Sequence, residues 1–231
     1  MKIPGNRFSP LVVDVSDWSA VQAAFKQVDE QEKELAILIN NAAIYERFDF
    51  LDVDTEHFMR SIAINLGGTV ACCSEALKHM IPQGFGRIIN VTTFADLDPL
   101  PGSSAYSVSK GAARVFSRAL VADLADRFPD IVTSDWIPGA LATAMGIADG
   151  IQPEVSAIWG ANLALEHDRS LNGVLFDRDI EVLPPQSLKG RVKSFLLRRG
   201  QRPRRLTRPQ DQDSETLDRM RDSLSEPAKI D

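Results

Sequence analysis

The chain has 231 residues, of which 44% are hydrophobic and 25% charged, and its formal net charge is −6. This length and composition predict one soluble domain with a sizeable core, and the negative charge argues against a general nucleic-acid binder. No apolar run approaches the roughly 20 residues that a membrane-spanning helix needs, so an integral membrane protein is not expected.

The predicted elements alternate along the chain between short buried strands and longer helices. Apolar, β-branched runs predict strands, and apolar residues that recur every three or four positions predict helices. In chain order the predicted strands are Leu11–Val15, Leu35–Ile39, Arg87–Val91, Ile131–Trp136 and Val174–Phe176. The predicted helices follow an N-cap at Asp17, run from an N-cap at Thr55 to His79 with Pro82 just beyond, and span Ala105–Arg127 and Pro153–Glu166.

Strands that alternate with helices of this length predict an α/β fold, in which a doubly wound parallel sheet carries helices on both faces. Ligands bind such sheets beyond the carboxyl ends of the strands. The loops after Ile39, Val91 and Trp136 are therefore the expected place of a functional site.

The composition changes after about Pro184, so we assign residues 1–184 to a single domain and residues 185–231 to a tail. Nine Lys or Arg and no acidic residue lie between Lys189 and Arg208, and the chain from Pro209 onward is acidic and polar. The tail is expected to be partly disordered. The basic stretch would attract anionic lipid or nucleic acid if it acted alone. We favour a solvated tail neutralised by its acidic neighbour, and expect neither a membrane nor a nucleic-acid partner.

The chemistry is expected at Tyr106 and Lys110, which stand one helical turn apart and so share a face of the helix. A free tyrosine has a pKa near 10, too high for a good base at neutral pH. A neighbouring cation favours the phenolate, and a lowered pKa would let Tyr106 exchange a proton with a substrate oxygen. Taken alone, the spacing is more typical of two exposed side chains on one helix face than of a catalytic pair.

Further motifs surround this pair in a fixed order. They are Asn40-Asn41-Ala42-Ala43, Asn65, Asn90-Val91-Thr92-Thr93, Tyr106-x-x-x-Lys110, and Pro138-Gly139 with Thr143. In these motifs the chain resembles the short-chain dehydrogenase/reductase family over roughly Leu11 to Phe176. The resemblance implies a Rossmann-like fold and an oxidoreductase that uses NAD or NADP to interconvert an alcohol and a ketone or aldehyde.

Carried over by position, the resemblance makes Tyr106 the general acid/base and Lys110 the modulator of its pKa and a ligand of the nicotinamide ribose. Asn65 matches the residue that holds a water in the proton relay. Thr93 stands thirteen residues before the tyrosine, where the family has a serine. Its hydroxyl can still donate to a substrate oxygen, although the added methyl narrows the pocket.

The resemblance also implies contacts with the dinucleotide. Asp14 corresponds to the residue at the adenine, Asn40 and Ala42 flank the adenosine ribose, and a third group lies against the nicotinamide carboxamide. This third group is Pro138, Gly139 and Thr143. Two structural alternatives stay open: Asn40 and its neighbour cap a strand and tie it to the next one, and Pro138-Gly139 is an ordinary turn.

One motif of the family is missing, namely the Gly-rich turn that receives the pyrophosphate at a helix end. The sequence begins about where the third strand is expected, so the fold is predicted to be N-terminally shortened by two strands and two helices. We expect weak or no cofactor binding unless a partner or a domain swap covers the open sheet. The alternative function is therefore a non-catalytic member of the fold that acts by binding or pairing.

The resemblance further implies a small-molecule alcohol or carbonyl substrate and a homodimer or homotetramer formed through the helices of Cys72 and Tyr106. Only about 35 residues separate Gly139 from the last strand, which predicts an open pocket. Tyr45, Phe48 and Phe50 line its mouth or, as we favour, pack internally.

The remaining candidates give no metal site. Cys72 and Cys73 are adjacent and the histidines His57, His79 and His167 lack ligand-like spacing, so no bound metal and no disulfide framework are expected. The first residues lack the apolar stretch of a secretory signal. These features predict a cytoplasmic protein.

Overall fold

The computed structural model describes residues 8–31, 34–184 and 202–206. The α-helices are α1 Trp18–Gln31, α2 Thr55–Ile62, α3 Gly68–Gln83, α4 Ser104–Leu124 and α5 Pro153–Leu165. The strands are β1 Ile37–Asn40, β2 Gly86–Val91, β3 Ile131–Ile137, β4 Leu175–Asp177 and β5 Ile180–Glu181. A π-helical turn, η1 Ala63–Gly67, links α2 to α3, and a 3₁₀ turn, η2 Arg169–Leu171, precedes β4.

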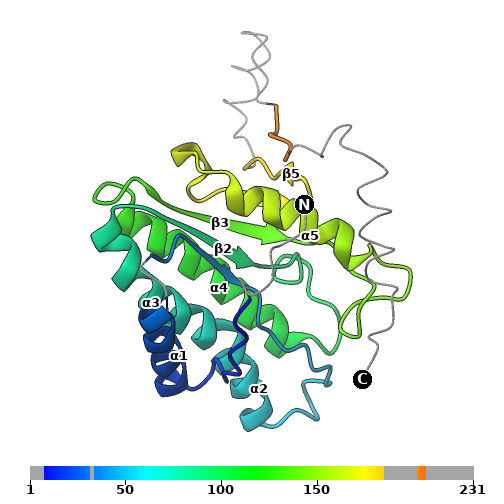
Figure 1. Ribbon diagram of the computed structural model, residues 1–231. Helices are drawn as coiled ribbons and strands as arrows, with labels where there is room; N and C mark the ends of the chain where they lie inside the picture. Colours follow the sequence, from blue (N-terminus) through cyan, green and yellow to red (C-terminus); the bar gives the residue numbers. More distant parts are fainter. Residues whose placement is uncertain (1–7, 32–33, 185–201, 207–231) are drawn as a thin grey trace, which may run out of the picture.

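The strands form one five-stranded sheet in the order β1-β2-β3-β4-β5. The first four strands are parallel, and β5 pairs antiparallel with β4. Figure 1 shows the sheet between α5 on one side and α3 and α4 on the other. The predicted parallel α/β fold with helices on both faces is confirmed. The hairpin to β5 was not predicted; it turns at Arg178, which has a positive φ of 55°.

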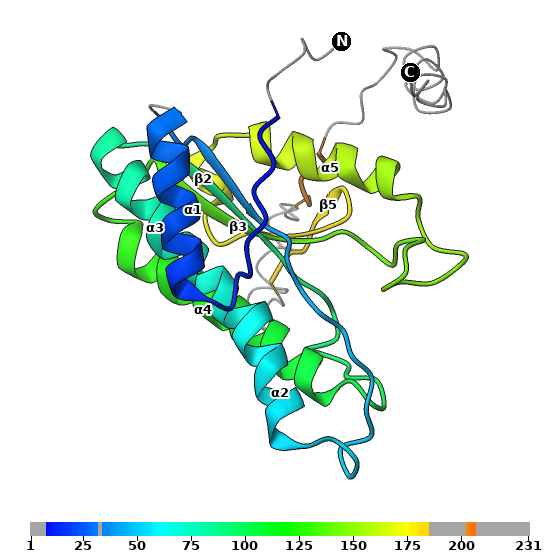
Figure 2. The same cartoon turned by 60° about the horizontal axis from the view of Figure 1, so that its bottom comes forward.

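The two faces of the sheet carry separate apolar clusters, because side chains alternate along each strand. Ile89 and Val132 face α5 and pack with its Leu163. The neighbouring strand residues Ile88 and Ile131 face the other way and pack with side chains of α3 and α4. Figure 2 shows α1 lying outside α3 on that second face. Both layers hold the strand ends, and hence the loops after them, in fixed positions.

Leu11–Val15 does not form the predicted strand. The segment is irregular, Val12 is fully exposed, and a turn at Val15 and Ser16 leads into α1. A strand is a ladder of hydrogen bonds to a neighbour, and among the described residues no strand lies beside this segment. The prediction of a strand is therefore wrong for this segment. The predicted cap of α1 is confirmed, since the Asp17 carboxylate accepts the Ser19 backbone N–H at 2.8 Å.

The predicted helix from Thr55 to His79 differs in three details. Its N-cap is Asp54 and not Thr55, because the Asp54 carboxylate accepts the backbone N–H of His57 at 2.8 Å. The π-helical turn η1 interrupts it. The helix also runs past Pro82, which lies within its last turn, and ends where Gly84 adopts a left-handed φ of 71°.

A short part of the segment assigned to the tail packs on the domain. Arg205 bridges to Ile180 of β5, and Leu206 is buried in the cluster beneath α5. Arg204 pairs with Glu181 at 2.8 Å. Most of residues 185–231, including the basic stretch before Arg202, lies outside the described residues. Within the described ranges no helix is long and apolar enough to cross a membrane.

Candidate active site

The predicted site residues gather where the parallel strands end. β1 and β2 are in register at Asn40 and Asn90, and β2 and β3 are in register at Val91 and Trp136, so the loops after them leave the same edge of the sheet. α4 begins at this edge. The buried Lys110 in its second turn donates from Nζ to the Val91 carbonyl at 2.8 Å, which joins the helix to the end of β2.

Tyr106 lies half-buried in the first turn of α4. Its ring stacks on Tyr45, with 4.4 Å between the ring centroids and 34° between the planes. Burial raises the pKa of the Tyr106 phenol above its usual value, a hydrogen bond with Thr93 opposes this, and the nearby Tyr45 adds to the rise. The Thr93 and Tyr106 hydroxyls therefore lie within hydrogen-bonding reach of each other.

The direction of the Tyr106 pKa differs from the sequence-based expectation of a lowered value. Burial removes water from a phenolate more strongly than the nearby groups stabilise it, and the hydrogen bond of Lys110 goes to the Val91 carbonyl. Burial also lowers the pKa of Lys110 to about 8. Without a ligand, the phenol is thus neutral at pH 7, while Lys110 remains mostly charged.

Asn65 is fully buried in the π-helical turn η1 and is held by three hydrogen bonds. Its Nδ2 donates to the Ile44 carbonyl at 3.0 Å and to Ser109 Oγ at 2.9 Å, and its Oδ1 accepts the Ile44 N–H at 2.8 Å. Ser109 lies between Tyr106 and Lys110 on α4. The Asn65 side chain therefore ties the loop after β1 to the helix of the candidate proton-handling pair.

A row of buried polar side chains lies beneath the site, on the α4 face of the sheet. Asn40 donates to Asn90 Oδ1 at 2.8 Å, Asn90 donates to Ser117 Oγ at 2.8 Å, and Ser117 donates to Asp135 at 2.6 Å. Asn40 thus ties its strand to the next, which is the structural alternative for this residue. Burial raises the pKa of Asp135 to about 6.

Ser117 and Asp135 were missed by the sequence reasoning. The available signal was their polarity at positions that the pattern predicts to be buried. Asp135 is a carboxylic acid in a strand that is buried at every residue, and Ser117 lies seven residues after Lys110, on the same face of α4. A buried carboxyl group in a strand needs a partner. The sequence does not show which helix supplies it.

The fold places the residues predicted to contact the dinucleotide in separate regions of the molecule. Pro138, Gly139 and Thr143 follow β3 at the site edge, and Gly139 has a φ of 89°, which favours glycine. Ala42 is exposed just after β1. Asp14, expected at the end of a strand, instead lies in an exposed turn, where its carboxylate accepts the Ser16 N–H at 2.9 Å.

The site fits one half of a nicotinamide dinucleotide. Lys110 keeps N–H donors beyond the one bonded to Val91, and the adjacent Thr92 has a buried Oγ1 without a hydrogen-bond partner among the described residues. These are polar groups suited to a ribose and a carboxamide. Among the described helices, none begins with a Gly-rich turn beside a strand, the feature that receives a diphosphate at a helix end.

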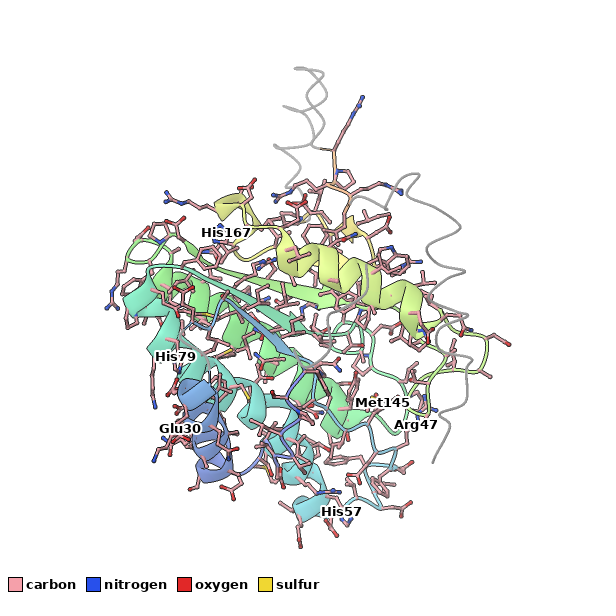
Figure 3. The ribbon with its side chains drawn as sticks, in the orientation of Figure 1. Glu30, Arg47, His57, His79, Met145 and His167 are labelled. Carbon is pink, nitrogen blue, oxygen red and sulfur yellow. The ribbon has the colours of Figure 1, made fainter. Side chains whose placement is uncertain are left out.

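Two of the three histidines, His79 and His167, lie away from this site, whereas the His57 ring packs on Phe48 in the loop after β1. His57 contacts the cap residue Asp54 and His79 contacts Asp29 on α1, while His167 contacts the Asp130 carbonyl before β3. Figure 3 shows His79 and His167 at the opposite end of the molecule from Arg47, which lies on the side toward which β2 and β3 run. Within the described ranges no group of three or more His, Cys, Asp or Glu is placed to hold a metal ion.

A model of the family described as short chain dehydrogenase matches residues 1–152 of the chain. The chain is 34% identical over 145 residues to 2-(R)-hydroxypropyl-CoM dehydrogenase of Xanthobacter autotrophicus, covering 62% of this chain and 57% of that protein. It is 31% identical over 148 residues to carbonyl reductase (NADPH) 2 of Sus scrofa, covering 64% and 58%.

The described fold also matches a solved structure from Agrobacterium tumefaciens that is assigned as a gluconate dehydrogenase. The TM-score is 0.61 at 28% sequence identity, and the match covers 71% of each chain. A shorter stretch of 116 residues is 40% identical to the probable oxidoreductase EphD of Mycobacterium tuberculosis, covering 50% of this chain and 20% of that protein. The chain spans little more than half the length of the curated dehydrogenase and reductase it matches, and a fifth of EphD.

Proposed function

Because the chain belongs to the short-chain dehydrogenase family, we propose that it is an oxidoreductase that interconverts an alcohol and a ketone or aldehyde with NAD or NADP. The observation that carries this proposal is the half-buried Tyr106 phenol, hydrogen-bonded to Thr93 and placed one turn from the buried Lys110 where the parallel strands end. The dehydrogenase and carbonyl reductase among its relatives support the same reaction class.

In this proposal Tyr106 handles the proton. In carbonyl reduction its Oη–H donates the proton to the substrate oxygen, and in alcohol oxidation the same oxygen accepts it. A phenol whose pKa is at or above its usual value is protonated at neutral pH, as proton donation in the reductive direction requires. Thr93 donates its hydroxyl hydrogen to the substrate oxygen and so orients the carbonyl.

Lys110 and Asn65 support this step. In this proposal the buried Lys110 ammonium, one helical turn from Tyr106, supplies a positive charge to the site and offers N–H donors to a ribose. The Asn65 side chain positions α4 and the loop after β1, and we assign its relay water to the one Oδ1 acceptor site that its three hydrogen bonds leave open. A nicotinamide nucleotide, when bound, supplies or accepts the hydride. Pro138, Gly139 and Thr143 are the residues that would hold its carboxamide.

The test is the turnover of Tyr106→Phe, which removes only the phenolic oxygen. We expect carbonyl reduction to fall by about 100-fold or more, the usual contribution of a positioned proton donor. Turnover is followed by nicotinamide absorbance with small ketones and aldehydes at millimolar NADH or NADPH. Thermal unfolding of the variant checks that its fold is intact. Equal turnover of the variant and the native chain contradicts the role of Tyr106.

Nucleotide affinity tests the other half of the site. Because the sequence lacks a Gly-rich strand–helix turn, we expect dissociation constants for NAD and NADP weaker than micromolar in calorimetry of the 231-residue chain. Micromolar affinity would show that other groups receive the diphosphate.

We also propose that a second copy of the chain packs on α4. Val108 and Val115 are both more than half exposed and lie seven residues apart, on one face of that helix. They border a hollow of about 390 Å³, with Leu97 and Pro99 opposite. Light scattering after size exclusion is expected to give a dimer or tetramer that Val115→Arg converts to monomer. A monomeric native chain would contradict this.

A further inference from the structure

A second aromatic side chain and a cation accompany Tyr106 at the mouth of the site. Tyr45 stacks on Tyr106 at 4.4 Å between ring centroids. Arg47 lies over the Tyr45 ring, with its Cζ 5.2 Å from the ring centroid and its Nε donating to the Tyr45 hydroxyl at 3.1 Å. We propose that Arg47 binds an anionic group of the substrate, so that the substrate is an oxo or hydroxy acid; this rests on the proposed function.

The backbone holds these two side chains toward α4. Ile44 is bonded through both its N–H and its carbonyl to Asn65, and the Phe48 N–H donates to the Gly102 carbonyl at 3.1 Å. The segment between these two anchors is therefore fixed at both ends. Tyr45 contacts the Tyr106 ring, and its hydroxyl group accepts the hydrogen bond from Arg47.

The side chain of Glu46, which lies between Tyr45 and Arg47 in the sequence, is directed toward α2. Glu46 pairs with Arg60 of α2 at 2.9 Å, so the carboxylate next to Arg47 in the sequence is already neutralised. Asp49, the next acidic residue, accepts the backbone N–H of Leu51 at 2.9 Å. Among the described residues, no carboxylate forms an ion pair with Arg47 at 4.0 Å or less. Its guanidinium carries five N–H donors, and the Nε–H is the one that the Tyr45 hydroxyl occupies.

The distances set the size of the substrate. Arg47 Cζ lies no more than about 10 Å from the Tyr106 ring centre, since the separations of 5.2 and 4.4 Å share the Tyr45 ring. A carbonyl at the Tyr106 hydroxyl and an anionic group at Arg47 therefore fit within one small molecule, several bonds apart. A guanidinium binds a carboxylate through two parallel N–H donors, which an ammonium does not reproduce.

The experiment uses the fact that Tyr45 and Tyr106 are the only tyrosines of the chain. Ring-¹³C-tyrosine labelling then gives two NMR signals, both from the site, which Tyr45→Phe assigns. The probes are levulinate and 5-oxohexanoate, each compared with its neutral methyl ester, titrated with and without NADP. We expect the acids to shift the tyrosine signals with at least tenfold lower dissociation constants than the esters.

Three variants isolate Arg47. Arg47→Gln is expected to abolish the preference for the acid, and Arg47→Lys to retain only part of it. Arg127→Gln is the matched control, because Arg127 lies over the Phe128 ring at 5.1 Å in a similar contact far from Tyr106; this variant is expected to keep the full preference. Circular dichroism checks that each variant is folded.

The outcomes separate this inference from the proposed function. An acid preference that is lost in Arg47→Gln supports the role of Arg47 even if no turnover is found, because binding is what is measured. Equal binding of acid and ester by the native chain, with and without NADP, overturns it. An acid preference that survives in Arg47→Gln overturns it as well. Failure of all four probes to shift the tyrosine signals also overturns it.

Discussion

The two edges of the sheet differ in how they are covered. At one edge, β4 pairs with β5, Arg205 bridges to that hairpin, and Leu206 closes the cluster under α5. At the other edge, β1 pairs with β2, and within the described ranges no strand lies on its outer side. Ile39 of β1 is 47% exposed, and the apolar segment before α1 stays irregular. An apolar, β-branched sequence thus becomes a strand only where a neighbour offers hydrogen bonds.

Function divides along the same line. The proposed proton-handling residues Thr93, Tyr106 and Lys110 stand in the loop after β2 and on α4, beside a strand that has neighbours on both sides. Of the adenosine contacts that the resemblance implies, Asp14 and Ala42 lie exposed on the open side, while Asn40 is half-buried and donates to Asn90 of β2.

The two environments can be compared directly, because an isoleucine of the open strand β1 is in register with an isoleucine of the covered strand β2. Ile39 on β1 is paired with Ile89 on β2, and these isoleucines are 47% and 0% exposed. We expect Ile89→Ala to lower the free energy of unfolding by about 2–5 kcal/mol and Ile39→Ala by less than about 1 kcal/mol. Urea titration measures both. Similar losses at the two positions would mean that the β1 edge is covered in solution.

A smaller change in the free energy of unfolding is expected from the ionisation of Asp135, whose carboxyl group lies beneath the candidate site. Burial raises the pKa of Asp135 to about 6, with Arg114 and Arg118 opposing this rise and Asp96 adding to it. Since the folded-state pKa lies above the unfolded value, ionised Asp135 costs stability above pH 6, and this cost disappears as the pH falls toward 4. It amounts to roughly 3 kcal/mol at most.

Asp135→Asn keeps an acceptor for the Ser117 hydroxyl and removes the charge. The variant is therefore expected to gain stability over the native chain above pH 7, and to lose this advantage between pH 7 and pH 4. Urea unfolding of both proteins at several pH values measures the difference. A difference independent of pH would show that Asp135 does not ionise in this range.

At the covered edge, Leu206→Ala is expected to cost about 2 kcal/mol, because the side chain is buried in the cluster under α5. A loss below about 0.5 kcal/mol in thermal or urea unfolding would mean that residues 202–206 contribute little to this edge.

The smallest effect is expected at Val12, which is fully exposed in the irregular segment at the open edge. Val12→Thr is predicted to change the unfolding free energy by less than about 0.5 kcal/mol. A larger loss would show that the segment packs as a strand in solution, against a second chain or in another arrangement.

Much of the fold was predictable from local pattern. The strands after Leu35, Arg87 and Ile131 and the helices of Asp17 and Tyr106 appear within a few residues of their predicted bounds. Strand polarity and the common edge of the loops then follow from the alternation of strands and helices. The order of Asn65, Thr93, Tyr106 and Lys110 could also be read directly.

What the sequence determined by itself, then, was periodicity and order, because these depend on neighbours along the chain. Tertiary structure decided that Leu11–Val15 stays irregular, which groups Asn65 bonds to, and that Arg47 lies close to the site over the Tyr45 ring. It also decided that burial raises the pKa of Tyr106 above its usual value. Each of these depends on groups far apart in sequence: a strand needs a hydrogen-bonding partner, and a pKa depends on the water and charge around it.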